Sequence, residues 1–166
     1  MTMLPTRPHL IHATALSLGG VAVLVRGASG AGKSDLALRC LALAPGPLVS
    51  ERFELIADDQ VHMTLRDRVL IASCPPTIHG LIEVRGVGII RVEPAVPAPV
   101  RLIVDLVAPG AVPRLPDDTG RVSISGIEIP HLVLDPTPAS APLKLALALI
   151  RAASMTANAA VQRVAN

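Results

Sequence analysis

The residues best suited to chemistry form a glycine-rich stretch near the start of the chain. It reads Gly27-Ala28-Ser29-Gly30-Ala31-Gly32-Lys33-Ser34 and matches the pattern G-x-x-x-x-G-K-[ST] in full. The glycines let backbone N–H groups point at phosphate oxygens, and a helix beginning near Lys33 adds its positive end. Lys33 can reach the β- and γ-phosphates, and the Ser34 hydroxyl can ligate Mg²⁺. We therefore expect a nucleoside triphosphate site, with ATP and Mg²⁺ as its ligands.

The flanking sequence favours a phosphate loop over an unliganded turn. Val21–Arg26 is an apolar, β-forming run that leads directly into the loop, and Ser34–Ala44 has leucines at helical spacing. Strand, loop and helix in this order are the setting that the motif requires. A plain glycine-rich turn would need neither Lys33 nor Ser34, so the context predicts a ligand.

Two adjacent acids, Asp58-Asp59, close the short buried strand expected at Phe53–Ala57. Neighbouring side chains of an extended chain point to opposite sides. One carboxylate could then hold Mg²⁺ or its water while the other faces an incoming hydroxyl. The alternative is a turn pair that caps backbone N–H groups. Asp105 is a rival acid on a buried strand, although an apolar residue rather than a loop follows it.

The elements that must position these residues predict an α/β fold. Hairpins are expected at Gly19-Gly20 and at Arg66-Asp67-Arg68. Without a visible repeat or linker, residues 1–166 predict one domain. The expected elements, in chain order, are strands at Leu10–Leu18, Val21–Arg26, Phe53–Ala57, Val61–Leu65, Val69–Ser73, Val100–Val107, Val122–Ile124 and His131–Leu134, and a helix from Leu143 to about Val164.

Composition narrows the classes of function. The chain has one Phe, no Trp or Tyr, and a formal net charge of +2. Single-stranded nucleic-acid binding relies on aromatic platforms and strong positive charge, so we expect no nucleic-acid partner. No apolar run is long enough to span a bilayer and no secretory signal begins the chain, which predicts a cytoplasmic protein without a membrane partner. Cys40 and Cys74 lack metal-ligand spacing and are expected to be buried free thiols.

Four stretches fall in the order and spacing of the HPr kinase/phosphorylase family, which the chain resembles over roughly residues 8–134. The chain resembles a truncated form, because no separate N-terminal domain precedes His12; a loop and helix at 135–166 complete it. The last stretch carries Glu83, Arg85, Gly86 and Gly88, a signature that is not shared widely. The stretches are His12–Ala15, the glycine-rich loop, Leu55–Asp59 and Leu81–Val92.

The resemblance implies a fold and an activity. The fold is a P-loop-containing core similar to the nucleotide-binding domain of phosphoenolpyruvate carboxykinase, with a mixed β-sheet, flanking helices and a C-terminal helix. The activity is an ATP-dependent kinase for a serine of HPr, a phosphocarrier of the phosphotransferase system, or of an HPr-like carrier. Family members are typically hexamers, and many also remove the phosphate with inorganic phosphate as acceptor.

The resemblance also implies roles for single residues. Lys33 binds the phosphates, Ser34 and Glu83 ligate Mg²⁺, and Asp59, flanked by Asp58, accepts the proton of the HPr serine. His12 matches an active-site histidine, and Arg114 falls where a catalytic arginine is expected. The alternatives are a structural hydrogen-bonded His12, a Glu83–Arg85 ion pair, and glycines at 86 and 88 that merely shape a turn. His62, His79 and His131 are interpreted as structural.

One segment departs from the family pattern. Full-length members carry a Pro-x-Arg-Pro-Gly-Arg stretch linked to dephosphorylation. The matching segment of this chain, Leu134–Lys144, has prolines but neither of the two arginines, and Lys144 is its remaining cation. A guanidinium grips phosphate differently from an ammonium, so phosphorylase activity and control by sugar phosphates stay open. A small-molecule kinase and a non-catalytic ATP-binding sensor also remain as alternatives.

Overall fold

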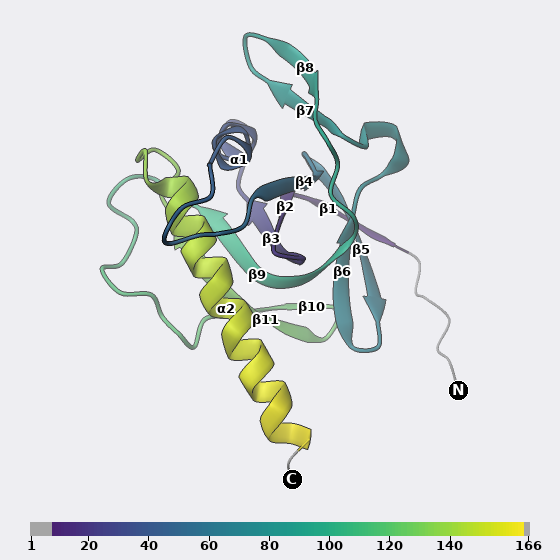
Figure 1. The fold of residues 1–166 in the computed structure, drawn as a ribbon, viewed down its shortest axis with the longest axis vertical. Coiled ribbons are helices and arrows are strands. Elements are labelled where there is room, and N and C mark those ends of the chain that lie inside the picture. The colour runs from purple at the N-terminus through teal and green to yellow at the C-terminus, as the bar shows by residue number, and fades with distance from the viewer. Residues whose placement is uncertain (1–7, 165–166) are drawn as a thin grey trace.

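The computed structural model describes residues 8–164. A mixed, curled sheet carries two helices, and a separate two-stranded hairpin projects from it (Figure 1). The elements are β1 (His9–His12), β2 (Thr14–Leu18), β3 (Val21–Arg26), α1 (Lys33–Leu41), β4 (Phe53–Ala57), β5 (Gln60–Arg66), β6 (Val69–Ser73), a 3₁₀ turn (Pro76–Ile78), β7 (Leu81–Val84), β8 (Gly88–Arg91), β9 (Ala98–Leu106), β10 (Arg121–Ile124), β11 (Ile127–Leu134) and α2 (Ala141–Val164).

The long strand β9 joins the two halves of the sheet. The main path runs β1-β5-β6-β9-β3-β2-β4, and β11 also pairs with β9 and carries β10 at its other end. The pairs β3–β9 and β9–β11 are parallel, and the other pairs in this sheet are antiparallel. The carboxyl ends of β3, β9 and β11 therefore lie at one edge, directly below the turn into α1.

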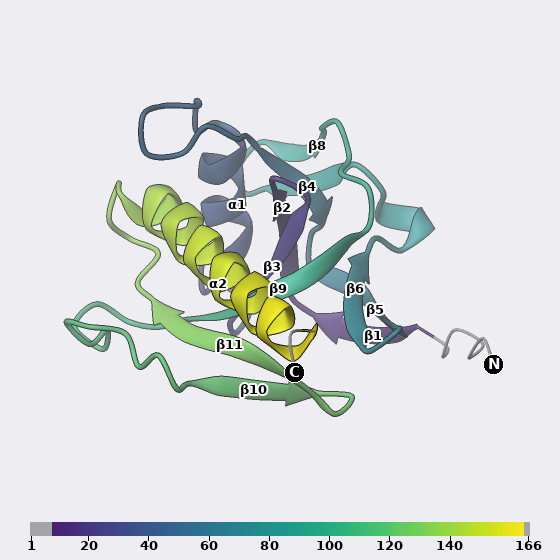
Figure 2. The same cartoon turned by 60° about the horizontal axis from the view of Figure 1, so that its bottom comes forward.

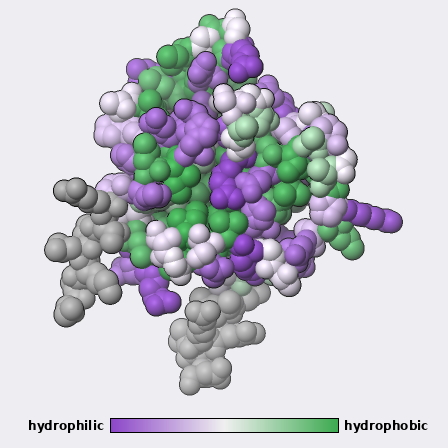
Figure 3. Space-filling model, turned by 180° about the vertical axis from the view of Figure 1, so that it is seen from behind, coloured by the Kyte–Doolittle hydropathy of each residue, from purple (hydrophilic) through white to green (hydrophobic). Residues whose placement is uncertain are grey.

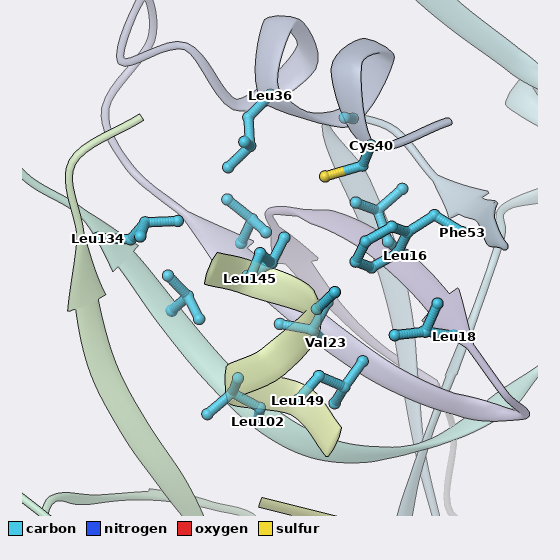
Figure 4. Packing of buried hydrophobic residues seen from close by; sticks show 14 of the residues in the cluster. Leu16, Leu18, Val23, Leu36, Cys40, Phe53, Leu102, Leu134, Leu145 and Leu149 are labelled. Atoms are coloured by element: carbon cyan, nitrogen blue, oxygen red, sulfur yellow. The ribbon is translucent and has the colours of Figure 1, made fainter. Parts of the chain in front are cut away.

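Successive side chains of the central strands point to opposite faces of the sheet, and this creates two apolar layers. Val23 and Val25 of β3 face the helices, whereas Ala22 and Leu24 face the opposite side. On the helix side, Leu145 and Leu149 of α2 pack among side chains of the sheet and of α1 (Figure 4). Figure 2 shows both helices lying over the same face of the sheet. α2 thus packs on the chain's own core.

Most expected elements are present, with shifted boundaries. The run Leu10–Leu18 is divided at Ala13, where the chain leaves β5 to pair with β3 and β4. β11 begins before its expected start because residues 127–130 pair with β10 before the strand continues along β9. α2 starts at Ala141, since Pro142 fits the first turn of a helix. α1 begins at Lys33 and ends at Leu41, inside its expected end.

The packing of α2 predicts unequal effects of two leucines on the same helix. Leu145 is fully buried and Leu147 is 40% exposed. Leu145→Ala should lower the free energy of unfolding by about 2–5 kcal/mol, because it leaves a cavity in the core. Leu147→Ala is the matched control and should have a much smaller effect. Urea unfolding measures both, and equal losses would contradict this packing.

Candidate functional site

The glycine-rich residues 27–34, here the phosphate loop, join the end of β3 to the start of α1. Gly30 and Gly32 have φ values of 80° and 95°, in the region that favours glycine. Gly27 is needed for a different reason, because a Cβ there would lie 2.9 Å from the Ala31 Cβ. Backbone conformation at Gly30 and Gly32, and close packing at Gly27, therefore favour glycine at these three positions of the loop.

Lys33 is the first residue of α1 and is only 6% exposed. Its Nζ donates hydrogen bonds to the carbonyl oxygens of Gly27, at 2.8 Å, and Ala28, at 3.1 Å. The ammonium group thus lies over the phosphate loop itself, at a helix N-terminus. A buried lysine with carbonyl partners alone carries positive charge that an anion can use.

Asp58 follows β4 and its carboxylate joins three other elements. Ser34 Oγ lies 2.9 Å and 3.0 Å from its two oxygens, and Thr14 Oγ1 of β2 donates to Oδ1 at 2.9 Å. The backbone N–H of Glu83 in β7 donates to Oδ2 at 3.2 Å. Each donor is neutral. The end of β4, β2, the phosphate loop and the β7–β8 hairpin therefore meet at one carboxylate.

The environment of Asp58 suits a cation. The residue is 6% exposed, yet none of the ion pairs among the described residues includes it. A buried carboxylate without a cationic partner is costly. Mg²⁺ prefers oxygen ligands and is often held by one or two carboxylates together with substrate phosphates. Asp58, Ser34 and the exposed Glu83 carboxylate fit such a site, although no cluster of three acids, histidines or cysteines gathers within the described part of the chain.

Asp59 lies at a strained turn and points the other way. Its φ is 67°, and the Gln60 N–H donates to the Asp58 carbonyl across it, which makes a γ-turn. The Asp59 side chain is 64% exposed, and Oδ1 lies 3.1 Å from Nδ1 of His12. The two acids do diverge, but through a left-handed residue rather than through an extended chain. Strain of this kind is often found at functional sites.

The phosphate loop, α1 and β7 border a cleft of about 320 Å³. Its lining brings together half of the residues that the sequence singled out, with basic, acidic and hydroxyl side chains facing one space, whereas His12 and Asp58 are not among the lining residues. Among them are Ser29, Lys33, Ser34, Asp59, Glu83 and Arg85.

The β7–β8 hairpin carries two of the four signature residues, Glu83 and Arg85, to this cleft. Gly86 and Gly88 have φ values of 82° and 118° and shape its tip, as one alternative expected. Glu83 and Arg85 do not form an ion pair with each other in the described structure. Beyond the cleft the hairpin exposes Val87 and Ile89. The projecting end of the molecule shows hydrophobic beside strongly hydrophilic surface (Figure 3).

The rival acid, Asp105, is engaged below the phosphate loop. It accepts two hydrogen bonds from Arg26, at 2.7 Å and 2.8 Å, and its Oδ2 lies 2.9 Å from Nε2 of His131. The Arg26 hydrogen bond is the main reason that the pKa of Asp105 lies below its ordinary value. These residues link β3, β9 and β11 at their carboxyl ends. Asp105 and His131 are therefore assigned to holding the strands that support the site.

Arg114 is not brought together with the other candidates. It lies in the exposed loop between β9 and β10 and does not line the cleft. His62 and His79 are also outside the lining. Of the two thiols, Cys40 is buried, and Cys74 is only partly buried rather than buried as expected.

Two contributions were missed in the sequence. Thr14 lies in the family-like stretch His12–Ala15 but was given no role of its own, because threonine is an ordinary strand residue. Arg39 of α1 donates to the carbonyl oxygens of Pro136, at 2.5 Å, and Pro138, at 3.3 Å. It therefore brings a guanidinium to the segment where the sequence offered only Lys144. That contact joins residues about a hundred positions apart, so a local motif could not reveal it.

Comparisons with known proteins identify relatives of this chain. The model of the HPr serine kinase C-terminal domain matches residues 6–163. The HPr kinase/phosphorylase of Mycoplasma mycoides subsp. mycoides SC is 31% identical over 133 residues, which cover 73% of this chain and 40% of the relative. That of Stenotrophomonas maltophilia is 32% identical over 143 residues, covering 78% and 43%. The chain spans less than half the length of these curated relatives.

A solved structure extends the comparison to the fold. The Hpr(Ser) kinase/phosphatase from Coxiella burnetii matches with a TM-score of 0.73 and 26% identity, over 90% of this chain and 99% of that chain. The fold is therefore a mixed α/β fold with a curled sheet and a C-terminal helix. The chain belongs to the HPr serine kinase C-terminal domain family. This confirms the resemblance found in the sequence. No helix in the described part is long and apolar enough to cross a membrane.

The bonds of Asp105 predict a pH-dependent loss of stability. Because the folded-state pKa of Asp105 is lowered, its contribution is present at neutral pH and is lost as the pH falls below about 4. Asp105→Asn should therefore lower the free energy of unfolding at pH 7 by about 1 kcal/mol, a value reduced by partial solvent exposure. The difference from wild type should shrink towards pH 3.

Urea unfolding between pH 7 and pH 3 tests this prediction. Glu128→Gln is the control, because Glu128 is an exposed acid on β11. A difference between Asp105→Asn and wild type that stays constant across this range would contradict the role of the ionised pair.

Proposed function

We propose that this chain is an ATP-dependent kinase that transfers the γ-phosphoryl group to a serine of HPr or of an HPr-like phosphocarrier. The observation that carries the proposal is the bond between Ser34 of the phosphate loop and Asp58, with Asp59 exposed to the same cleft. The proposed triphosphate site and the exposed Asp59 carboxylate then face one space. Family membership supports the carrier as acceptor.

The donor half of the site consists of the phosphate loop and its cations. Loop N–H groups and the start of α1 would receive the phosphates, and Lys33 would exchange its carbonyl partners for phosphate oxygens. Mg²⁺, when bound, would neutralise charge on the phosphates, and Ser34, Asp58 and Glu83 are the residues proposed to hold it. Arg85 lines the cleft and supplies further positive charge.

The acceptor half depends on Asp59. Oδ1 is held near His12, so Oδ2 is left to accept the proton of an incoming serine hydroxyl. His12 in this role orients the base. Phosphoryl transfer needs positioning and charge neutralisation more than covalent help, and these residues offer both. Arg114 stays a proposed catalytic residue that requires movement of its loop towards the cleft.

Several finer statements belong to the same proposal. The core is proposed to be of the phosphoenolpyruvate carboxykinase type, and residues 1–166 to form one catalytic domain with its core at 8–134. A hexamer, a cytoplasmic location and the lack of nucleic-acid or membrane partners stay predictions from the sequence and the resemblance. Dephosphorylation of the carrier is left as an outcome of the assay.

The assay is transfer of labelled γ-phosphate from Mg²⁺-ATP to purified HPr and its paralogues. We expect label on a serine of one carrier. Label on a metabolite without any carrier would instead establish a small-molecule kinase. ATP binding without transfer to any acceptor would support a nucleotide sensor. Serine-phosphorylated HPr incubated with inorganic phosphate tests the reverse reaction in parallel.

Replacing Asp59 tests the acceptor half separately. Asp59→Asn should lower transfer by at least roughly 100-fold, because the general base is lost, while ATP affinity is unchanged. Asp67→Asn is a matched control: Asp67 is also exposed and has a φ of 47°, but it lies in the β5–β6 turn. Equal transfer by wild type and Asp59→Asn would remove Asp59 from this role.

A further inference from the structure

Thr14 lies on β2 outside the cleft lining, and its side chain is fully buried. Valine would fit such a strand position as well as threonine does, and a buried hydroxyl is costly unless it forms a hydrogen bond. That partner is Asp58, whose Oδ1 accepts the Thr14 hydroxyl at 2.9 Å. The bond connects the sheet interior to the carboxylate that meets the phosphate loop.

We propose that Thr14 is a positioning residue that sets the Mg²⁺ response of nucleotide binding by fixing the Asp58 carboxylate, an inference that rests on the proposed Mg²⁺-ATP site. Thr14 holds Oδ1, and the Glu83 N–H holds Oδ2. A carboxylate bonded at both oxygens cannot turn about its terminal C–C bond without losing one of them. Its orientation towards Ser34 is thereby fixed.

The orientation matters because Ser34 has a single hydroxyl proton and lies within reach of both Asp58 oxygens. When that proton is donated to Asp58, the lone pairs of Ser34 Oγ are left for a cation. If the carboxylate turns, the hydroxyl loses this preferred direction. Groups that orient metal ligands in this way typically change metal affinity by roughly 10- to 100-fold.

A threonine hydroxyl suits this task because it is neutral. A lysine or arginine at the same place would orient Asp58 but also neutralise it, and would compete with Mg²⁺. The three observed donors, Thr14, Ser34 and the Glu83 N–H, are neutral and leave the negative charge available. Thr14 therefore orients the carboxylate without cancelling its charge.

Paired substitutions separate the hydroxyl from the packing of the side chain. Thr14→Val keeps the branched shape and removes the donor, whereas Thr14→Ser keeps the donor and removes a methyl group. Thr14→Ala and Thr14→Ser form a second pair that differs by the hydroxyl alone, in case the valine variant does not fold. Thr64→Val is the control, because Thr64 is a buried threonine on β5 that is not bonded to Asp58.

The measurement is equilibrium binding of a fluorescent ATP analogue, titrated with Mg²⁺ and repeated in EDTA, together with melting temperature. Thr14→Val and Thr14→Ala should raise the Mg²⁺ concentration for half-maximal tightening by about tenfold or more, with unchanged affinity in EDTA. Thr14→Ser should keep the wild-type Mg²⁺ response although it melts at a lower temperature. Thr64→Val should respond as wild type does.

Two results would overturn this inference but leave the proposed Mg²⁺-ATP site intact. They are a wild-type Mg²⁺ response in Thr14→Val, and equal impairment of Thr14→Ser and Thr14→Ala. The second would mean that only the packing of the side chain matters. A wild-type protein that binds nucleotide without any Mg²⁺ dependence would remove the proposed metal site and this inference together. The wild-type titration therefore distinguishes the two failures.

Discussion

The Asp58 carboxylate is the point at which the separate parts of the site become one structure. It accepts hydrogen bonds from Ser34 in the phosphate loop, from Thr14 in β2 and from the backbone of Glu83 in β7. It is nearly buried and has no cationic partner in the described structure. Burial of such a charge is costly, and the cost makes this place favourable for Mg²⁺.

The sheet explains how these distant residues come to one edge. Parallel pairing places the carboxyl ends of β3 and β9 together, and the phosphate loop begins at that edge. The Arg26–Asp105 pair links the two strands just before the loop, and His131 joins β11 to them. β2 and β4, on the other side of β3, bring Thr14 and Asp58 to the loop. A rigid support of this kind positions small loop groups accurately.

Local sequence signals were sufficient for the phosphate loop, most strands and the two helices. The loop glycines at 30 and 32 could be predicted because each adopts a positive φ, and a turn at Gly86 and Gly88 was one of the alternatives for the same reason. The different roles of Asp58 and Asp59 could not, since they depend on a γ-turn and on burial. Thr14 and Arg39 were missed for a related reason: their partners, Asp58 and the 136–138 segment, are far away in the sequence. Arg114 was placed by resemblance alone, and its loop lies outside the cleft.

The most direct test of the central role of Asp58 is a crystal structure with Mg²⁺ and a non-hydrolysable ATP analogue. The account predicts phosphates on the loop at residues 27–34, Mg²⁺ in contact with Ser34 Oγ, and the Ser34–Asp58 bond still formed. Phosphates bound elsewhere, or an Asp58 carboxylate turned away from Ser34 and the metal, would contradict it.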